Sequence, residues 1–224
     1  MEEEVVVVKK KKKVVLKVVT SILLCLFLAI CAVAIFFNVT HKYYIVYGPS
    51  MTPTLNNGVI ATKESKDGVF VSTIKGFNRG DIVVLDKNFE VENEAEKYVI
   101  KRVIAMAGDK IKIEEINGVN RVVVIVDGRY SVLDEPYLES YDVNRLLKNN
   151  FEEMVKKLSL AVDVNGFLTI EKDHIFLLGD NRLNSNDSSS YGPKHKDGVV
   201  GKVDYIIYNN TNLYGQVISQ FFGW

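Results

Sequence analysis

Hydrophobic residues are distributed unevenly along this chain, and the longest apolar run lies near its start. Residues 18–37 form a stretch of twenty residues without a charge. A helix of that length spans the ~30 Å hydrocarbon core of a bilayer, so the run predicts a transmembrane helix. A cleaved signal peptide is the alternative, because Ala32-Val33-Ala34 has the small-x-small form. The run is long for a signal peptide and continues through Phe37, which favours an uncleaved anchor.

Basic residues immediately precede the apolar run. Residues 1–17 contain six lysines and three glutamates. Because positive charge is retained on the cytoplasmic side, this end is expected in the cytoplasm. We therefore expect a lysine-rich cytoplasmic tail over residues 1–17, a single-pass anchor over 18–37 and an extracytoplasmic domain over 38–224, in the cell membrane.

The rest of the chain has the pattern of a mainly β protein. Short β-branched or alternating runs are separated by turn pairs such as Asn57-Gly58 and Asn117-Gly118. One helical stripe interrupts them over 142–160, which predicts a small inserted helical lobe at about 139–165 in an all-β domain. The apolar segment 216–224 is too short to span a bilayer; it would dock on the core or rest at the interface. The strands expected are 43–47, 59–63, 81–85, 98–106, 110–116, 121–126, 174–178 and 203–208.

Charge and cysteine content exclude several classes of function. The formal net charge is zero, and residues 18–224 carry 22 basic and 25 acidic residues. This mildly acidic balance does not indicate a nucleic-acid-binding surface. The only cysteines, Cys25 and Cys31, lie in the apolar run, so the outer domain contains no disulfide or reactive thiol.

A serine on a constrained backbone is the first candidate for chemistry. Ser50 lies in the stretch Gly48-Pro49-Ser50-Met51-Thr52-Pro53, between two prolines. Pro49 has a fixed φ, and Pro53 disfavours the helical region for the residue before it, so the serine is held in place. Ser50 is therefore a candidate nucleophile. A turn in which it only bonds the backbone is the equally supported alternative.

A serine nucleophile needs a base, and a lysine is the better-placed candidate. None of His41, His174 and His195 has a distinctive context. A lysine acts as a base only when neutral, and burial in apolar surroundings favours that form. Lys101 lies among aliphatic residues in a predicted strand, where alternation directs one of Lys101 and Arg102 inward. The alternative is an edge strand that uses both cations against aggregation.

A third stretch, residues 178–192, is rich in short polar side chains between two glycines. Such a loop suits the groups that orient a catalytic base. It could also be an ordinary turn loop, or a weak calcium loop in which Asp180, Asn184 and Asp187 supply oxygens. The spacing is not that of an EF-hand, so we expect no metal and no cofactor.

The order of these motifs resembles bacterial type I signal peptidase of the single-anchor type, over residues of about 14–208. The motifs that carry the resemblance are the anchor, the Ser50 stretch, Arg79-Gly80-Asp81-Ile82-Val83, Lys101-Arg102-Val103-Ile104, Asp134-Glu135-Pro136-Tyr137-Leu138, and Gly179-Asp180-Asn181-Arg182 with Ser185 and Asp187. The resemblance implies a membrane-bound serine endopeptidase that removes signal peptides from exported preproteins after small residues, at Ala-x-Ala sites. Its partners would be those signal peptides and the bilayer.

The resemblance also implies roles for single residues. Ser50 would be the nucleophile and, through its backbone N–H, an oxyanion donor; Lys101 would be the general base. Ser185 would orient the lysine, and Asp187 would brace the loop. The substrate strand would pair between 43–47 and 98–101 by β-addition. Shallow pockets for small side chains would be lined by Val46, Met51, Leu55 and Ile100.

The chain departs from the family pattern at several positions. Ala105 and Ala107 replace a glycine and a proline after the lysine motif, Gly48 lacks the hydroxyl that some members have there, and Ser189 replaces the arginine that would pair with Asp187. Arg182 or another cation would have to compensate. Two other functions remain open: a relative that processes one dedicated precursor, and an anchored β-domain that only binds a peptide or partner. The oligomeric state is not determined by the sequence.

Overall fold

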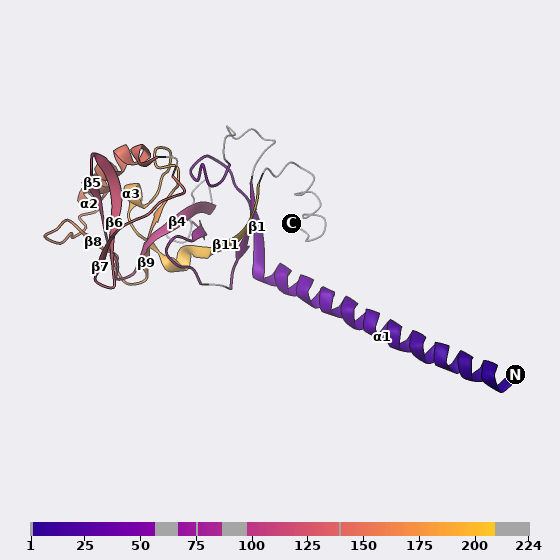
Figure 1. Ribbon diagram of the computed structural model, residues 1–224. Coiled ribbons are helices and arrows are strands. Elements are labelled where there is room, and N and C mark those ends of the chain that lie inside the picture. The colour runs from indigo at the N-terminus through magenta and orange to yellow at the C-terminus, as the bar shows by residue number, and fades with distance from the viewer. Residues whose placement is uncertain (1, 57–66, 75, 87–97, 139, 209–224) are drawn as a thin grey trace. The chain divides into compact units, whose positions relative to one another are not determined.

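A computed structural model describes residues 2–56, 67–74, 76–86, 98–138 and 140–208 of the chain (Figure 1). The expected strand 59–63 and the apolar segment 216–224 lie outside these residues. The chain divides into two units, Met1–His41 and Lys42–Trp224.

The first unit is a single helix, α1 (Glu2–Thr40). Its Lys13–Thr40 part is long and apolar enough to cross a membrane, and both cysteines lie there without a disulfide. The hydroxyl of Thr40 donates to the carbonyl of Phe36 at 2.7 Å in the last turn. The ring of His41 stacks on Phe37 with centroids 4.2 Å apart. The ring of His41 therefore contacts the helix of the first unit.

Within the described residues, the second unit contains two β-sheets, which confirms the predicted mainly β fold (Figure 1). One sheet has seven strands in the order β1-β2-β11-β3-β4-β9-β10, and the other has four in the order β7-β6-β5-β8. β4 ends at Met106 and β5 begins at Lys110, so a short turn leads from one sheet to the other. The strands are β1 (His41–Ile45), β2 (Gly68–Ser72), β3 (Ile82–Asp86), β4 (Tyr98–Met106), β5 (Lys110–Ile116), β6 (Val119–Val126), β7 (Arg129–Val132), β8 (Leu168–Thr169), β9 (His174–Leu178), β10 (Lys194–His195) and β11 (Val199–Ile207).

The strand predictions succeed where the apolar pattern is strong. The predicted bounds of β4, β5 and β9 agree with the structure, whereas β11 begins four residues before the predicted start at 203. The sequence pattern did not predict β2, which lies next to the edge strand β1 of the seven-stranded sheet, or the short β7, β8 and β10. β2 is short and almost wholly buried, so it shows no alternation of apolar and polar residues.

The inserted segment contains less regular helix than its pattern predicted. A 3₁₀ helix, η2 (Tyr141–Leu146), leads into α2 (Leu147–Lys157), and Ser159 follows with a φ of +52°. Two further short helices are α3 (Ser188–Tyr191) and η3 (Lys196–Gly198). The apolar face of α2 packs into the core with apolar side chains of β5, β6 and β9. The insertion is therefore part of the main core.

The core consists of three clusters of buried side chains. The largest joins the four-stranded sheet, α2 and β9 around Phe151 and Phe176, whose rings meet edge to face at 6.0 Å. A second cluster contains Val46, Met51 and Leu55 packed against β2 and β3. The third lies between β3, β4 and β9. The second cluster fixes the position of the stretch that contains Ser50.

Because Phe151 is 4% exposed and contacts Phe176, its truncation should leave a cavity in the largest cluster. We expect Phe151→Ala to lower the free energy of unfolding by about 3–5 kcal/mol. Leu146→Ala is the matched control, because Leu146 is 47% exposed and its truncation should cost less than about 1 kcal/mol. Denaturant unfolding of the two variants in detergent measures both; equal losses would contradict this description of the core.

Candidate functional site

Ser50 lies in a compact turn whose apolar residues anchor it. The amide of Thr52 donates to the carbonyl of Pro49 at 3.1 Å, and that of Leu55 donates to Met51 at 2.9 Å. Met51 and Leu55 are 1% and 0% exposed in the second core cluster. The turn is therefore held to the core by these two side chains, whereas Ser50 is partly exposed.

The side chain of Lys101, on β4, reaches this turn. Its Nζ lies 2.9 Å from Ser50 Oγ and also donates to the carbonyl of Ile100 at 2.9 Å. Lys101 is only 3% exposed. A largely buried lysine amine within hydrogen-bond distance of a serine hydroxyl is positioned to act on that hydroxyl. His174 and His195 instead contact one another, with ring centroids 5.4 Å apart on β9 and β10.

The neighbouring Arg102 points to the opposite face of β4. Its guanidinium makes a bidentate pair with Asp180, through Nε at 2.8 Å and Nη2 at 2.6 Å, and its Nη1 donates to the Gly80 carbonyl. The Arg102 side chain is 11% exposed. Sequence analysis expected one of the two cations inside; both are largely buried, on opposite sides of the strand. The edge-strand alternative does not fit, since β4 pairs with both β3 and β9.

The loop after β9 holds the serine turn through a set of direct bonds. The amide of Asn181 donates to the Ser50 carbonyl at 3.1 Å. Its side chain donates to the Pro49 carbonyl at 3.0 Å and to Thr52 Oγ1 at 2.9 Å, and Thr54 Oγ1 donates to Asp180. Two segments that are about 130 residues apart in the sequence are therefore held together by direct hydrogen bonds. Sequence analysis identified this loop as a candidate but did not assign these contacts.

Ser185 lies beside the same turn, next to Gly179. A Cβ added at Gly179 would come within 2.2 Å of Ser185 Oγ and 2.5 Å of the Ser50 carbonyl oxygen, so both groups lie against that glycine. The Ser185 hydroxyl is buried and has no hydrogen-bond partner among the described residues. A buried hydroxyl without a partner is unusual in a native protein and points to a functional contact.

Asp187 is held by donors other than the arginine of the family pattern. Its carboxylate accepts from the amide of Gly179 at 2.9 Å, and from the amide and hydroxyl of Ser189 at 3.1 and 2.8 Å. Ser189 thus supplies a neutral donor at the position where the family has a cation. Arg182, the cation that sequence analysis considered as a substitute, instead pairs with Glu135.

The carboxylate oxygens of this loop are already bonded to protein donors. The oxygens of Asp180 accept from Arg102 and Thr54, and those of Asp187 accept from the protein donors described above. Among the residues that the structure describes, no three His, Cys, Asp or Glu side chains are grouped to hold a metal ion. The two carboxylates that the calcium-loop alternative would use are thus bonded to protein donors.

A groove of about 830 Å³ runs past Ser50 and Lys101. One wall is formed by residues 43–50 and the other by residues 98–101, with Val69, Val84 and Asn186 between them. Val46 and Ile100, both expected in substrate pockets, line the groove. Met51 and Leu55, which are 1% and 0% exposed, are not among its lining residues. At its far end Tyr44 meets Tyr98 at 5.3 Å, and burial, with Tyr98 and Asp86 nearby, raises the pKa of Tyr44.

Both walls present strand edges to the groove. β9 pairs with β4 only from Arg102 onward, so within the described residues no strand pairs with that edge of residues 98–101. β1 is likewise the edge strand of its sheet in that part of the chain. An extended peptide could add to both edges through main-chain hydrogen bonds.

Asn56 is a residue of the site that sequence analysis missed. Its side chain donates to the carbonyls of Val46 and Gly48, both at 3.1 Å, and accepts from the amide of Asp67 at 2.9 Å. Asp67 in turn accepts from the Asn56 amide at 2.7 Å. This clamp, with Asn56 in the left-handed region at φ +57°, fixes the wall that contains Val46. In the sequence, Asn56 is marked only by its position before the turn pair Asn57-Gly58, which does not indicate a role in the site.

Comparisons with known proteins identify the family of the chain. A family model described as signal peptidase, peptidase S26, matches residues 18–208. Signal peptidase I of Bacillus caldolyticus is 35% identical over 181 residues, which are 80% of this chain and 86% of that protein. Signal peptidase IB of Staphylococcus aureus (strain N315) is 32% identical over 170 residues, 72% of this chain and 75% of that protein.

A solved structure of signal peptidase I from Enterococcus faecalis V583 is 19% identical, and the match covers 58% of this chain and 97% of that one, with a TM-score of 0.36. The family assignment rests on the sequence matches alone. The family match over residues 18–208 and the relative that is 35% identical over most of both chains show that this chain belongs to the signal peptidase family, peptidase S26, and is a serine peptidase.

Proposed function

We propose that this chain is a membrane-anchored endopeptidase that removes signal peptides from exported preproteins after small residues, using Ser50 as nucleophile and Lys101 as general base. The observation that carries the proposal is the 2.9 Å contact between Lys101 Nζ and Ser50 Oγ at a lysine that is 3% exposed. A serine hydroxyl within hydrogen-bond reach of a buried amine is the arrangement that activates a serine without histidine.

The dyad accounts for both halves of the reaction. Neutral Lys101 takes the proton of Ser50 as Oγ attacks the scissile carbonyl carbon, and the resulting ammonium then protonates the leaving amine. An acyl-enzyme remains on Ser50. Lys101, neutral again, takes a proton from water, and the hydroxide formed attacks the acyl carbon. Ser50 leaves with that proton, so the dyad returns to its starting state.

Supporting residues follow from the same geometry. Lys101 Nζ contacts Ser50 Oγ and the Ile100 carbonyl. We assign to Ser185, whose buried hydroxyl has no hydrogen-bond partner among the described residues, the role of orienting this amine. Asp187 holds the amides of Gly179 and Ser189 and so braces the loop that contains Ser185. The Ser50 backbone N–H would stabilise the oxyanion, because Gly48 has no side chain to do so.

Substrate recognition would use the two strand edges of the groove. A preprotein segment added between residues 43–47 and 98–101 would place its scissile carbonyl near Ser50. Val46 and Ile100 line the wall on either side and would limit the neighbouring side chains to small ones such as alanine. Met51 and Leu55 would act only indirectly, by supporting the turn from the core.

The N-terminal helix would serve as the anchor, with the lysine-rich end in the cytoplasm and residues 38–224 on the outer face. Preproteins that engage the membrane through their own signal helices would then meet the site within the membrane plane. Confinement of both partners to one surface raises their effective concentration without any additional contact.

The first test is Lys101→Ala. Without the amine no group takes the proton of Ser50, so we expect cleavage of a precursor with an Ala-x-Ala site, in detergent or lipid, to fall by about 10⁴-fold or more. Lys148→Ala is the control: Lys148 is a partly exposed lysine on α2, and this variant should retain full activity. A penem or β-lactone probe should label Ser50 in the wild type.

Full cleavage by Lys101→Ala would exclude the dyad. A wild type that neither cleaves a dispersed precursor nor takes up the acylating probe would favour the anchored binding domain. A wild type that is labelled at Ser50 but does not cleave the general precursor would favour a relative with one dedicated substrate.

Ser185→Ala should lower kcat by about 10- to 100-fold, because a lysine that loses an orienting bond spends less time in line with Ser50. The same precursor assay measures it, and Ser190→Ala, an exposed serine of the same loop region, is the control. A wild-type rate for Ser185→Ala would remove Ser185 from the mechanism.

Gly179→Ala should lower kcat by about 100-fold. The added Cβ would stand 2.5 Å from the Ser50 carbonyl oxygen, so the backbone of the serine turn must move, and small displacements at a reacting centre are costly. Gly76→Ala, where a Cβ meets nothing within 4 Å, is the matched control. An active Gly179→Ala enzyme would show that the loop and turn do not need their observed spacing.

A further inference from the structure

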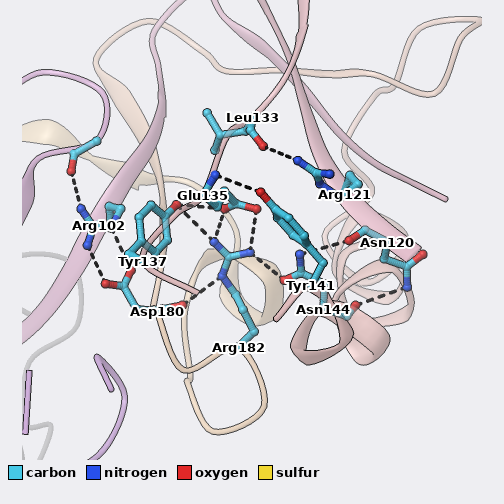
Figure 2. Close-up of polar contacts among 12 residues, drawn as sticks. Arg102, Asn120, Arg121, Leu133, Glu135, Tyr137, Tyr141, Asn144, Asp180 and Arg182 are labelled. Carbon is cyan, nitrogen blue, oxygen red and sulfur yellow. Dashed lines mark hydrogen bonds and ion pairs between the residues drawn. The ribbon is translucent and has the colours of Figure 1, made fainter. Parts of the chain in front are cut away.

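A chain of buried and partly buried polar side chains connects the inserted segment to the serine turn, and no part of the mechanism above uses it. We call it the polar bridge: Glu135, Tyr137, Asn144 and Arg182 (Figure 2). Glu135 and Tyr137 follow β7, Asn144 lies on η2, and Arg182 lies in the loop after β9. Figure 2 shows Arg182 among the other three, with Tyr137 between this group and the Arg102–Asp180 pair.

Arg182 and Glu135 form the centre of the bridge. Both side chains are 0% exposed, and they are paired through Arg182 Nη2 and Glu135 Oε1. Arg182 also donates to Asn144 Oδ1 at 2.7 Å and to the Gly179 carbonyl at 3.1 Å. Arg182 therefore ties the inserted segment directly to the glycine against which Ser185 and the Ser50 carbonyl lie.

Tyr137 links this pair to the opposite face of β4. Its hydroxyl donates to Glu135 Oε1 at 2.9 Å, and its ring lies 3.9 Å from the guanidinium carbon of Arg102. Burial and the negative charge of Glu135 raise the pKa of Tyr137, so the hydroxyl stays protonated and keeps donating. One side chain thus contacts both buried arginines of the site, since Arg182 Nη2 also approaches its hydroxyl at 3.4 Å.

The last step leads from Arg102 to the nucleophile. Arg102 pairs with Asp180, and Asp180 accepts from Thr54 of the serine turn. Asp180 is followed directly by Asn181, which binds the Ser50 carbonyl. Since Arg102 follows Lys101 on β4, a shift of the Arg102–Asp180 pair would move the general base and the nucleophile relative to each other.

The other end of the bridge is fixed to the four-stranded sheet. Asn144 donates to the Asn120 carbonyl on β6 at 3.1 Å, and Asn120 donates back to the Asn144 carbonyl at 3.3 Å. The Arg121 guanidinium covers the Tyr141 ring at 3.6 Å. The bridge therefore extends from a rigid sheet to the loop that carries the site, rather than ending at a solvent-exposed segment.

We propose that Glu135, Tyr137 and Arg182 are positioning residues for the peptidase reaction: they hold the Gly179–Asn181 loop and the Arg102–Asp180 pair so that Lys101 and Ser50 stay in contact. The inference rests on the proposed function of the dyad. A fully buried ion pair is poor evidence for stability alone, because apolar residues of similar volume usually stabilise as well. The Arg182–Glu135 pair is instead part of a set of directional hydrogen bonds. These bonds join the inserted segment to the loop after β9, which holds the serine turn.

Tyr137→Phe tests the bridge with the smallest change. It removes the hydroxyl that bonds Glu135 but keeps the ring over Arg102. Tyr141→Phe is the matched control, because it removes a hydroxyl that accepts from the backbone amide of Glu135 at 3.2 Å rather than one that donates to the Glu135 carboxylate. The full chain in detergent is titrated with the penem probe, and kcat, KM and the rate of probe acylation are reported per labelled Ser50.

We expect Tyr137→Phe to lower kcat and the acylation rate per labelled site by about 10-fold, with KM within about 2-fold of the wild type, because the groove is unchanged. Tyr141→Phe should stay within about 2-fold in all three. A purely structural role would lower only the fraction of chains that are labelled. Wild-type kcat per labelled site in Tyr137→Phe would overturn the proposal.

A double-mutant cycle with Thr54→Val tests the route. Thr54 donates to Asp180, and Arg102 lies over the Tyr137 ring, so both residues contact the Arg102–Asp180 pair. The double variant should therefore lose less activity than the product of the two single losses. Fully multiplicative losses would contradict coupling through that pair. If the wild type neither cleaves nor labels, the proposed function and this inference fail together; an active wild type with an unaffected Tyr137→Phe refutes the inference alone.

Discussion

The contact that the rest of the second unit supports is the 2.9 Å approach of the Lys101 amine, which is 3% exposed, to the Ser50 hydroxyl. Burial disfavours the charged form of a lysine, which suits the role of base that we propose for Lys101. Its long side chain has many rotamers, however, and must be restrained to stay in line with the serine. The carbonyl of Ile100 accepts a hydrogen bond from its amine, and we propose the same restraining role for Ser185.

The serine is restrained from several directions. The core holds its turn from below through Met51 and Leu55, and Asn56 fixes the preceding wall. The loop after β9 bonds the turn through Asn181 and accepts from Thr54. None of these contacts is local in sequence except those of Asn56, so the site exists only once the seven-stranded sheet has assembled. The geometry is therefore a property of the whole second unit.

Two departures from the family pattern have physical explanations in the structure. Ser189 replaces an arginine, yet the carboxylate of Asp187 is satisfied by one hydroxyl and two amides. Because these donors are close and neutral, the loop keeps its brace without a buried cation. Ala105 is fully buried at an irregularity in the pairing of β4 with β9, where a small side chain fits the core. The structure gives no comparable reason for Ala107.

The sequence by itself determined the apolar helix, the mainly β character of the second unit and the strands with a strong pattern, since these depend on local periodicity. Its motifs also identified Ser50, Lys101, Ser185 and Asp187 as candidates. Tertiary structure decided which groups touch: that Arg102 pairs with Asp180, that Arg182 pairs with Glu135 rather than Asp187, and that Met51 and Leu55 lie in the core. The two ion pairs join residues that are about 45–80 positions apart in the sequence. A local pattern of apolar and polar residues carries no information about which of several polar partners the folded chain brings together.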